Sequence, residues 1–148
     1  MDIQIEILEH GKELEIPCHA TEDSAGLDLR AAINENIILK PGQRALIPAG
    51  FLMAVPKGYN AEIRPRSGLA FKHGITVLNS PGTLDSDYRG EIKILLINLG
   101  ENDFVVERGM RIAQMVIQKY EKATLIATDS LDLNTSRSSG GYGSTGVK

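Results

Sequence analysis

The sequence predicts an all-β domain, on three observations. Turn signals such as Pro41-Gly42, Pro56-Lys57-Gly58 and Pro81-Gly82 recur at short intervals along the chain. Between them lie short segments rich in β-branched or apolar residues, at the spacing of roughly 8–12 residues typical of a sandwich or barrel. No window keeps a 3.6-residue apolar period for three turns, so we expect no long helix.

The expected strands follow this punctuation in order. The first segment, near the N-terminus, alternates apolar and polar residues, whereas later segments are more continuously apolar. One short helix is expected at residues 67–72, where Ser67 is placed to cap the first turn. The strand segments expected from the N-terminus onward are 3–8, 36–39, 45–47, 51–55, 75–78, 92–98, 104–106 and 112–118.

Length and charge narrow the class of protein. The 148 residues suit one domain. The net charge of −3, from 16 basic and 19 acidic residues, argues against a general nucleic-acid binder, which would carry a basic excess. The N-terminus lacks the basic and apolar regions of a secretory signal, and no apolar run approaches the ~18 residues of a membrane span. We therefore expect a cytoplasmic protein without a membrane partner.

The chain has one cysteine, Cys18. A single cysteine excludes an internal disulfide and fits a reducing compartment. Because no histidine-containing partner motif accompanies it, we expect Cys18 to be a small buried hydrophobe rather than a nucleophile. The sequence also lacks a P-loop, a Cys pair, a His-x-x-x-His spacing and a Gly-x-Ser-x-Gly elbow, which disfavours the sites that those motifs build.

Composition changes after Leu133. Residues 134–148 contain four Gly, four Ser and two Thr, with little to bury. We expect a domain at 1–133 and a mobile arm at 134–148. Composition alone suits a disordered terminus. However, Arg137 and Tyr142 stand in a frame of Gly and hydroxyl residues that could close over a phosphate.

Residues 84–91, Leu-Asp-Ser-Asp-Tyr-Arg-Gly-Glu, concentrate charge just before an apolar strand. Such charge is unfavourable there unless it is solvated, paired or functional. Asp85 or Asp87 could serve as a general base, and the ring of Tyr88 could pack on a flat ligand. The alternative is a solvated hairpin.

Three further segments carry polar residues where apolar ones are expected. Asp28 lies inside a strand-like run, either as a functional carboxylate or in contact with Arg30. Arg66 stands with Ser67 at the expected helix start, which suits either an anion or a plain cap. In the last strand, Arg111 and Gln114 need partners, and these could be purely structural. None of the three is decisive by itself.

Taken together and in order, these segments resemble the five motifs of the trimeric dUTP diphosphatase (dUTPase) family. The resemblance extends from about residue 22 to residue 146, and five ordered matches make it specific. The matching segments are 25–31, 65–70, 82–91, 107–115 and 137–146.

The resemblance implies a β-clip, that is, a jelly-roll-like barrel. It also implies a homotrimer whose three sites lie between subunits, each built from motifs of different subunits. The implied reaction converts dUTP and water to dUMP and pyrophosphate with Mg²⁺. Asp85 matches the carboxylate that activates the water, and Asp28 matches a residue near the water shell of the metal ion.

The substrate contacts transfer by the same resemblance. Tyr88 matches the residue that packs under the deoxyribose, and Tyr142 the aromatic that covers the uracil. Asn79 matches the residue that reads the uracil, in a pocket completed by Thr83, Leu84 and Lys93. The phosphate contacts are Arg66, Ser67, Gly68 and Gln114, and the contacts from the arm are Arg137, Gly143, Ser144 and Thr145.

The fifth motif departs from the family pattern at two positions. Ser138 stands where Gly is usual and Tyr142 where Phe is usual. Tyr keeps the stacking face, so we expect activity to survive.

Two rival interpretations remain open. One is a dCTP deaminase on the same fold, which the Asp85-to-Tyr88 string disfavours. The other is a non-catalytic nucleotide-sensing module, which the presence of Asp85, Arg66 and Arg137 disfavours.

Overall fold

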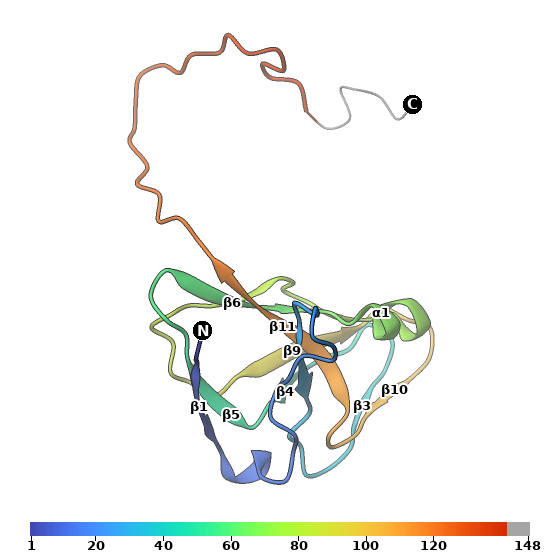
Figure 1. Cartoon of the computed structure of the whole chain (residues 1–148). Helices are drawn as coiled ribbons and strands as arrows, with labels where there is room; N and C mark the ends of the chain where they lie inside the picture. The colour runs from blue at the N-terminus through green and yellow to red at the C-terminus, as the bar shows by residue number, and fades with distance from the viewer. Residues whose placement is uncertain (142–148) are drawn as a thin grey trace.

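The computed structural model describes residues 1–141 as short antiparallel strands with one short helix at the edge of the molecule (Figure 1). A single 3-10 turn (Glu9–Gly11) follows the first strand, and α1 spans Ser67–His73. The strands are β1 (Gln4–Ile7), β2 (Leu27–Arg30), β3 (Ile37–Leu39), β4 (Arg44–Pro48), β5 (Phe51–Ala54), β6 (Tyr59–Arg64), β7 (Ile75–Val77), β8 (Gly82–Leu84), β9 (Lys93–Asn98), β10 (Phe104–Val106) and β11 (Arg111–Lys119).

These strands confirm the expected all-β, jelly-roll-like fold. They are hydrogen-bonded as four separate sheets rather than as one closed barrel, with orders β2-β11-β6-β8, β4-β9-β7, β1-β5 and β3-β10. Every expected strand segment contains a strand. Three strands are additional to the listed segments, namely β2, which lies in the strand-like run around Asp28, β6 and β8. In β6 the buried Ala61 and Ile63 alternate with the half-buried Glu62 and Arg64, which marks a strand with one face toward the core.

The core lies between the larger sheets. Ile94 and Leu96 on β9 are fully buried, as are Leu29 on β2 and Ile112 on β11. Each such side chain contributes about 1.5–3 kcal/mol when it is fully buried. Asn98 is the one fully buried polar residue in the described core, and it is satisfied. Its side-chain amide donates to the carbonyls of Leu39 (2.7 Å) and Asn102 (2.8 Å) and accepts from the Gly100 N–H (2.8 Å).

The helix begins at Ser67 as expected and ends one residue later than expected, at His73, but its N-cap is Arg66 rather than Ser67. Arg66 is the N-cap, with an extended backbone, and its carbonyl accepts from the N–H of Ala70 at 3.1 Å. No side chain caps this helix, so the expected capping role of Ser67 is wrong. Because Ser67 occupies the first helical position, its exposed side chain is not engaged in capping.

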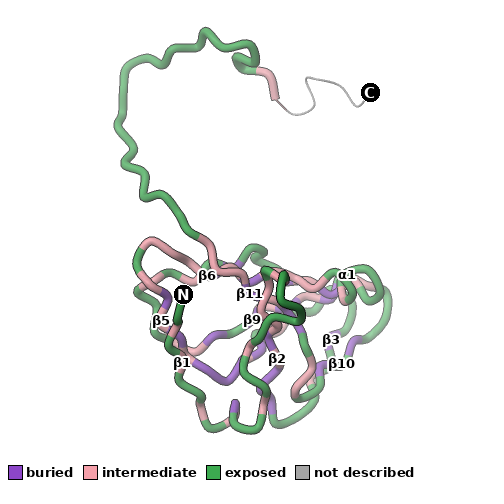
Figure 2. The backbone as a smooth tube through the Cα atoms, in the orientation of Figure 1, coloured by how far each residue is buried: buried purple, intermediate pink, exposed green. Residues whose placement is uncertain are grey.

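A segment beginning at Tyr120 runs away from the sheets (Figure 1), and its residues are exposed as far as Ser139 (Figure 2). Four large apolar side chains on it have no cover: Leu125, Ile126, Leu131 and Leu133 are each at least 72% exposed.

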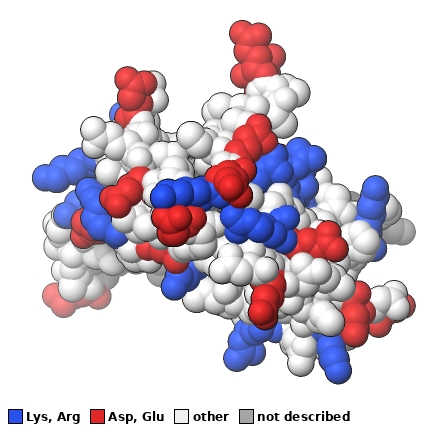
Figure 3. Space-filling model, turned by 90° about the horizontal axis from the view of Figure 1, so that it is seen from below, with Lys and Arg blue, Asp and Glu red and all other residues white. Residues whose placement is uncertain are grey.

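No helix in the described part of the chain is long and apolar enough to cross a membrane. On the face in Figure 3, basic and acidic side chains lie interspersed.

Candidate active site

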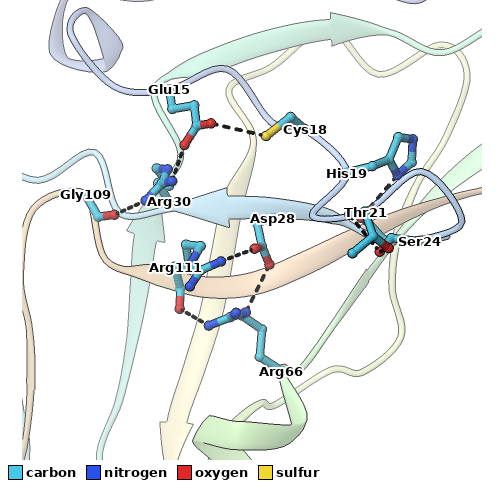
Figure 4. Close-up of polar contacts among 11 residues, drawn as sticks. Glu15, Cys18, His19, Thr21, Ser24, Asp28, Arg30, Arg66, Gly109 and Arg111 are labelled. Carbon is cyan, nitrogen blue, oxygen red and sulfur yellow. Dashed lines mark hydrogen bonds and ion pairs between the residues drawn. The ribbon is translucent and has the colours of Figure 1, made fainter.

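A three-residue charge cluster joins β2, β11 and the start of α1 (Figure 4). Asp28 Oδ1 lies 3.0 Å from Arg66 Nε, and Asp28 Oδ2 lies 3.0 Å from Arg111 Nη1. Arg66 also donates from Nη1 to the Arg111 carbonyl at 3.3 Å. One carboxylate thus orients two guanidinium groups, and the cluster has an excess positive charge.

A β-bulge in β11 makes this cluster possible. Gln114 pairs with Asp28 and Arg111 pairs with Arg30, but the register shifts between Arg111 and Ala113. Directly paired residues share a face of a sheet, and so do residues two apart on one strand. The extra residue in β11 therefore brings Arg111 and Gln114 to the same face as Asp28, although an unbroken strand would separate them.

A cavity of about 430 Å³ opens beside this cluster. Gln114 forms one wall, where its Nε2 donates to the Pro65 carbonyl at 2.9 Å. Its Oε1 lies so close to Gly26 that a Cβ there would approach to 2.3 Å, so a side chain at position 26 would displace the Gln114 amide. The sequence-predicted residues that line the cavity are Asp28, Arg66, Ser67, Gly68 and Gln114.

The chemistry of this cavity suits an anion. Two arginines, Arg64 and Arg66, line it against a single carboxylate among its described lining residues, that of Asp28. Arg64 is paired with Glu62, at 2.6 Å between Nη2 and Oε2. Arg66 is held by Asp28 and by the Arg111 carbonyl, and it stands next to Ser67, so a phosphate-like group there would meet both a guanidinium and a hydroxyl.

A second group of predicted residues lies in the connection around β8. A Cβ built on Gly82 would lie 3.3 Å from the side-chain amide nitrogen of Asn79. The Asn79 side chain therefore faces the start of β8. Asp85 follows Leu84 and is exposed, and the Asp85 carbonyl accepts from the Tyr88 N–H at 3.1 Å. Thr83 and Leu84 on β8 and Lys93 at the start of β9 flank this loop.

The structure does not bring the two groups together within one chain. Leu84 pairs with Ala61 on β6. Arg64 lines the cavity and lies three residues beyond Ala61 on the same strand, which places the two residues about 10 Å apart. The cavity lining includes neither Asp85 nor Tyr88 nor Asn79.

Arg137, the one predicted arm contact within the described residues, is not at the cavity either. Arg137 Nε donates to the Gly140 carbonyl at 3.0 Å, inside a local turn of the arm. Ser138 in that turn has φ of +46°, a conformation that glycine adopts more readily. Tyr142, Gly143, Ser144 and Thr145 lie outside the described residues.

Cys18 is exposed, so the expectation that it is buried is wrong. It lies in an irregular segment before β2 rather than in a strand, which leaves it no core position. Its thiol donates to Glu15 Oε1 at 3.4 Å, and this hydrogen bond raises the pKa of Cys18. Glu15 in turn is paired with Arg30, which lowers the pKa of that carboxyl. A raised thiol pKa disfavours the nucleophilic thiolate.

Fold and site together define a jelly-roll-like β protein with a cavity lined by arginine, whose chemistry suits an anion. The chain belongs to the dUTPase family, whose family model matches residues 12–146. Three relatives carry the name deoxyuridine 5'-triphosphate nucleotidohydrolase. Those from Bartonella bacilliformis and Neorickettsia sennetsu are 54% and 56% identical, and cover 100% and 98% of this chain and 92% and 97% of their own. The one from Rickettsia typhi is 61% identical and covers 89% of this chain and 88% of its own.

Solved structures agree on the fold. The Staphylococcus bacteriophage 80alpha dUTPase, solved with dUpNHpp, superposes with a TM-score of 0.88 at 24% identity and covers 99% of both chains. A variant dUTPase from phage phi11 of S. aureus, whose structure describes coordination of a structural Mg(II) ion, has a TM-score of 0.78 at 20% identity. It covers 88% of this chain and 98% of its own.

Proposed function

We propose that this chain hydrolyses dUTP to dUMP and pyrophosphate. The observation that carries the proposal is family membership over residues 12–146, with named relatives above 50% identity across nearly the whole chain. In the proposed step, a water oxygen bonds to the α-phosphorus. The bond from that phosphorus to the oxygen bridging the β-phosphorus breaks, pyrophosphate leaves, and the proton of the water passes to Asp85.

The cavity beside the Asp28 cluster is proposed to receive the triphosphate. Arg66 supplies a charged donor, Ser67 a hydroxyl, and Gln114 an amide already fixed in the wall. Gly68 has open space where a Cβ would stand, so a phosphate can approach its backbone closely. The excess positive charge at Asp28, Arg66 and Arg111 favours the anion.

Mg²⁺ is proposed as the cofactor. No group of three or more His, Cys, Asp or Glu within residues 1–141 could hold a metal ion alone. A site with few protein carboxylates fits Mg²⁺, which commonly binds through substrate phosphates and retained waters. Both oxygens of Asp28 already face guanidinium groups, so Asp28 suits contact through a metal-bound water. When bound, the ion would neutralise charge on the phosphate oxygens.

The loop around β8 is proposed to bind the nucleoside and to supply the base. Asn79 would read the uracil, with Thr83, Leu84 and Lys93 completing the pocket, and Tyr88 would pack under the deoxyribose. Asp85 is exposed on this loop, so its carboxylate can reach a water above the α-phosphate.

A homotrimer with shared sites is proposed because one chain keeps the phosphate cavity and the Asp85 loop apart. A neighbouring copy could present its Asp85 loop to the cavity of the first, and a head-to-tail ring of three would repeat this contact. The uncovered Leu125, Ile126, Leu131 and Leu133 on the C-terminal segment also favour burial against another subunit.

The arm, proposed as residues 134–148 beyond a domain of 1–133, would close over the bound nucleotide. Arg137, Gly143, Ser144 and Thr145 would contact the terminal phosphates, and Tyr142 would cover the uracil.

A cytoplasmic location is proposed because Cys18 is free and exposed, which suits a reducing compartment.

Subunit sharing is testable by complementation between Asp85→Asn and Arg66→Ala chains. Each parent should be nearly inactive. Trimers that contain both, purified through two different tags, should regain about one third of wild-type turnover, because one of three interfaces joins an intact Arg66 to an intact Asp85. Mixed trimers no more active than their parents would contradict sharing and place both groups in one chain's site.

Asp28→Asn tests whether Asp28 orients Arg66. Losing the charge weakens the hydrogen bond from Arg111, a kind worth about 1.5–3 kcal/mol, and removes the ion pair with Arg66. We therefore expect kcat/KM for dUTP to fall about tenfold or more, mostly through KM. Glu15→Gln is the matched control, since Glu15 pairs with Arg30 on the same sheet but does not line the cavity. Equal effects of the two substitutions would contradict the role of Asp28.

A further inference from the structure

The loop between β8 and β9 folds Tyr88 back over Gly90. The phenol hydroxyl of Tyr88 donates to the Glu91 carbonyl at 3.1 Å. A Cβ at Gly90 would lie 2.3 Å from that hydroxyl oxygen, 2.6 Å from Cζ and 3.0 Å from Cε2 of the ring. Gly90 has no positive φ, so the need for glycine here is set by the ring and not by the backbone.

The far end of this loop is anchored through Glu91. Its Oε1 accepts from Nε2 of His10 and from the Gly50 N–H, the latter at 3.3 Å. The next residue, Ile92, is fully buried and donates its N–H to the Phe51 carbonyl at 3.0 Å. The carbonyl that holds the Tyr88 hydroxyl therefore belongs to a residue tied to two other parts of the fold.

Arg89 holds the first half of the loop by binding its backbone carbonyls. Its Nη1 donates to the carbonyls of Ser86 at 2.8 Å and Tyr88 at 2.7 Å. Together with the bond from the Tyr88 N–H to the Asp85 carbonyl, these contacts fix both the backbone and the ring of Tyr88. An exposed aromatic ring, 44% accessible here, would otherwise be free to swing.

We propose that Gly90 and Glu91 are positioning residues that set the discrimination against ribonucleotides by holding the Tyr88 ring in place. The inference rests on the proposed function, in which that ring packs under the deoxyribose. A ring that can yield would make room for a 2′-hydroxyl, whereas a ring clamped over Gly90 cannot. Selectivity of this kind depends on rigid support behind the contacting group.

The test is the ratio of kcat/KM for dUTP to kcat/KM for UTP in the full-length oligomer. Gly90→Ala should displace the ring and lower this ratio about tenfold or more. In a Tyr88→Ala background, where no ring is left to displace, the same substitution should change the ratio no further. This difference separates action through Tyr88 from a general structural effect.

Glu91 gives a second pair of variants, which decides the matter if Gly90→Ala fails to fold. Glu91→Ala removes the anchor and should lower the ratio, whereas Glu91→Gln keeps an acceptor for the Gly50 N–H and for His10 and should restore it. The inference is overturned if folded Gly90→Ala or Glu91→Ala keeps the wild-type ratio, or if Gly90→Ala has the same effect without the ring. If the unmodified chain does not hydrolyse dUTP, the proposed function fails and this inference with it. If it does and the variants keep the ratio, only this inference fails.

Discussion

Asp85→Asn is expected to lower kcat for dUTP by roughly 10²–10⁴, the usual contribution of a general base. The amide cannot take the proton of the attacking water, although it has nearly the same shape as the carboxylate. Asp85 is exposed, outside the core and outside the phosphate cavity. The affinity for dUTP should therefore stay within a few-fold of wild type when it is measured by calorimetry on the inactive variant.

Asp87→Asn is the matched control for this substitution. Asp87 is also an exposed carboxylate and lies two residues further along the same loop, so it reports the effect of removing one charge there. It should leave kcat nearly unchanged. Near wild-type turnover in Asp85→Asn, or an equal loss in Asp87→Asn, would remove Asp85 from its proposed role.

Ending the chain at Leu133 should leave a folded oligomer with greatly reduced dUTP hydrolysis. Residues 134–141 make only local contacts within the arm, such as Arg137 Nε to the Gly140 carbonyl, so the body should lose no packing. What is lost is the charge of Arg137 and the proposed cover over the nucleotide. Thermal unfolding and light scattering report the fold and the oligomer, and steady-state kinetics report the activity.

Two single substitutions refine the truncation. Arg137→Ala should reproduce much of the loss, whereas Lys122→Ala removes an exposed charge from the same extended segment and should have little effect. If the shortened chain instead dissociates, as judged by its scattering mass, residues 134–148 are structural and the proposed closure over the site is wrong.

Much of the fold was predictable because local chemistry determines it. Short runs of apolar or β-branched residues between Gly and Pro turns fall in strands such as β5 and β9. The strand β6 was harder to predict, because its core-facing side offers only Ala61 and Ile63, which alternate with the charged Glu62 and Arg64. Cys18 was misplaced because residue type alone does not tell a core position from an irregular segment.

The candidate site was predictable only as a set of residues. Asp28, Arg66 and Gln114 meet at one cavity, as the ordered motifs suggested. The joint role of Arg111 with Asp28 depends on a β-bulge, and a bulge changes which face a residue occupies without leaving a clear local signal. The close contact between Gly26 and the Gln114 side chain joins residues far apart in the sequence, so only the structure reveals it.

The separation of Asp85 from the cavity also has no local signal. It follows from the order β11-β6-β8, in which β6 stands between the strand of Gln114 and the strand that leads to Asp85. Long-range pairing of this kind determines which groups one chain can bring together.

The most direct test of the central claim is product analysis in ¹⁸O-labelled water, with dUTP, dTTP, dCTP and UTP assayed in parallel, with and without Mg²⁺. The account predicts Mg²⁺-dependent pyrophosphate release strongly preferring dUTP, with the label in dUMP because water attacks the α-phosphorus. Absence of pyrophosphate from dUTP, label in the pyrophosphate, or ammonia released from dCTP would contradict it.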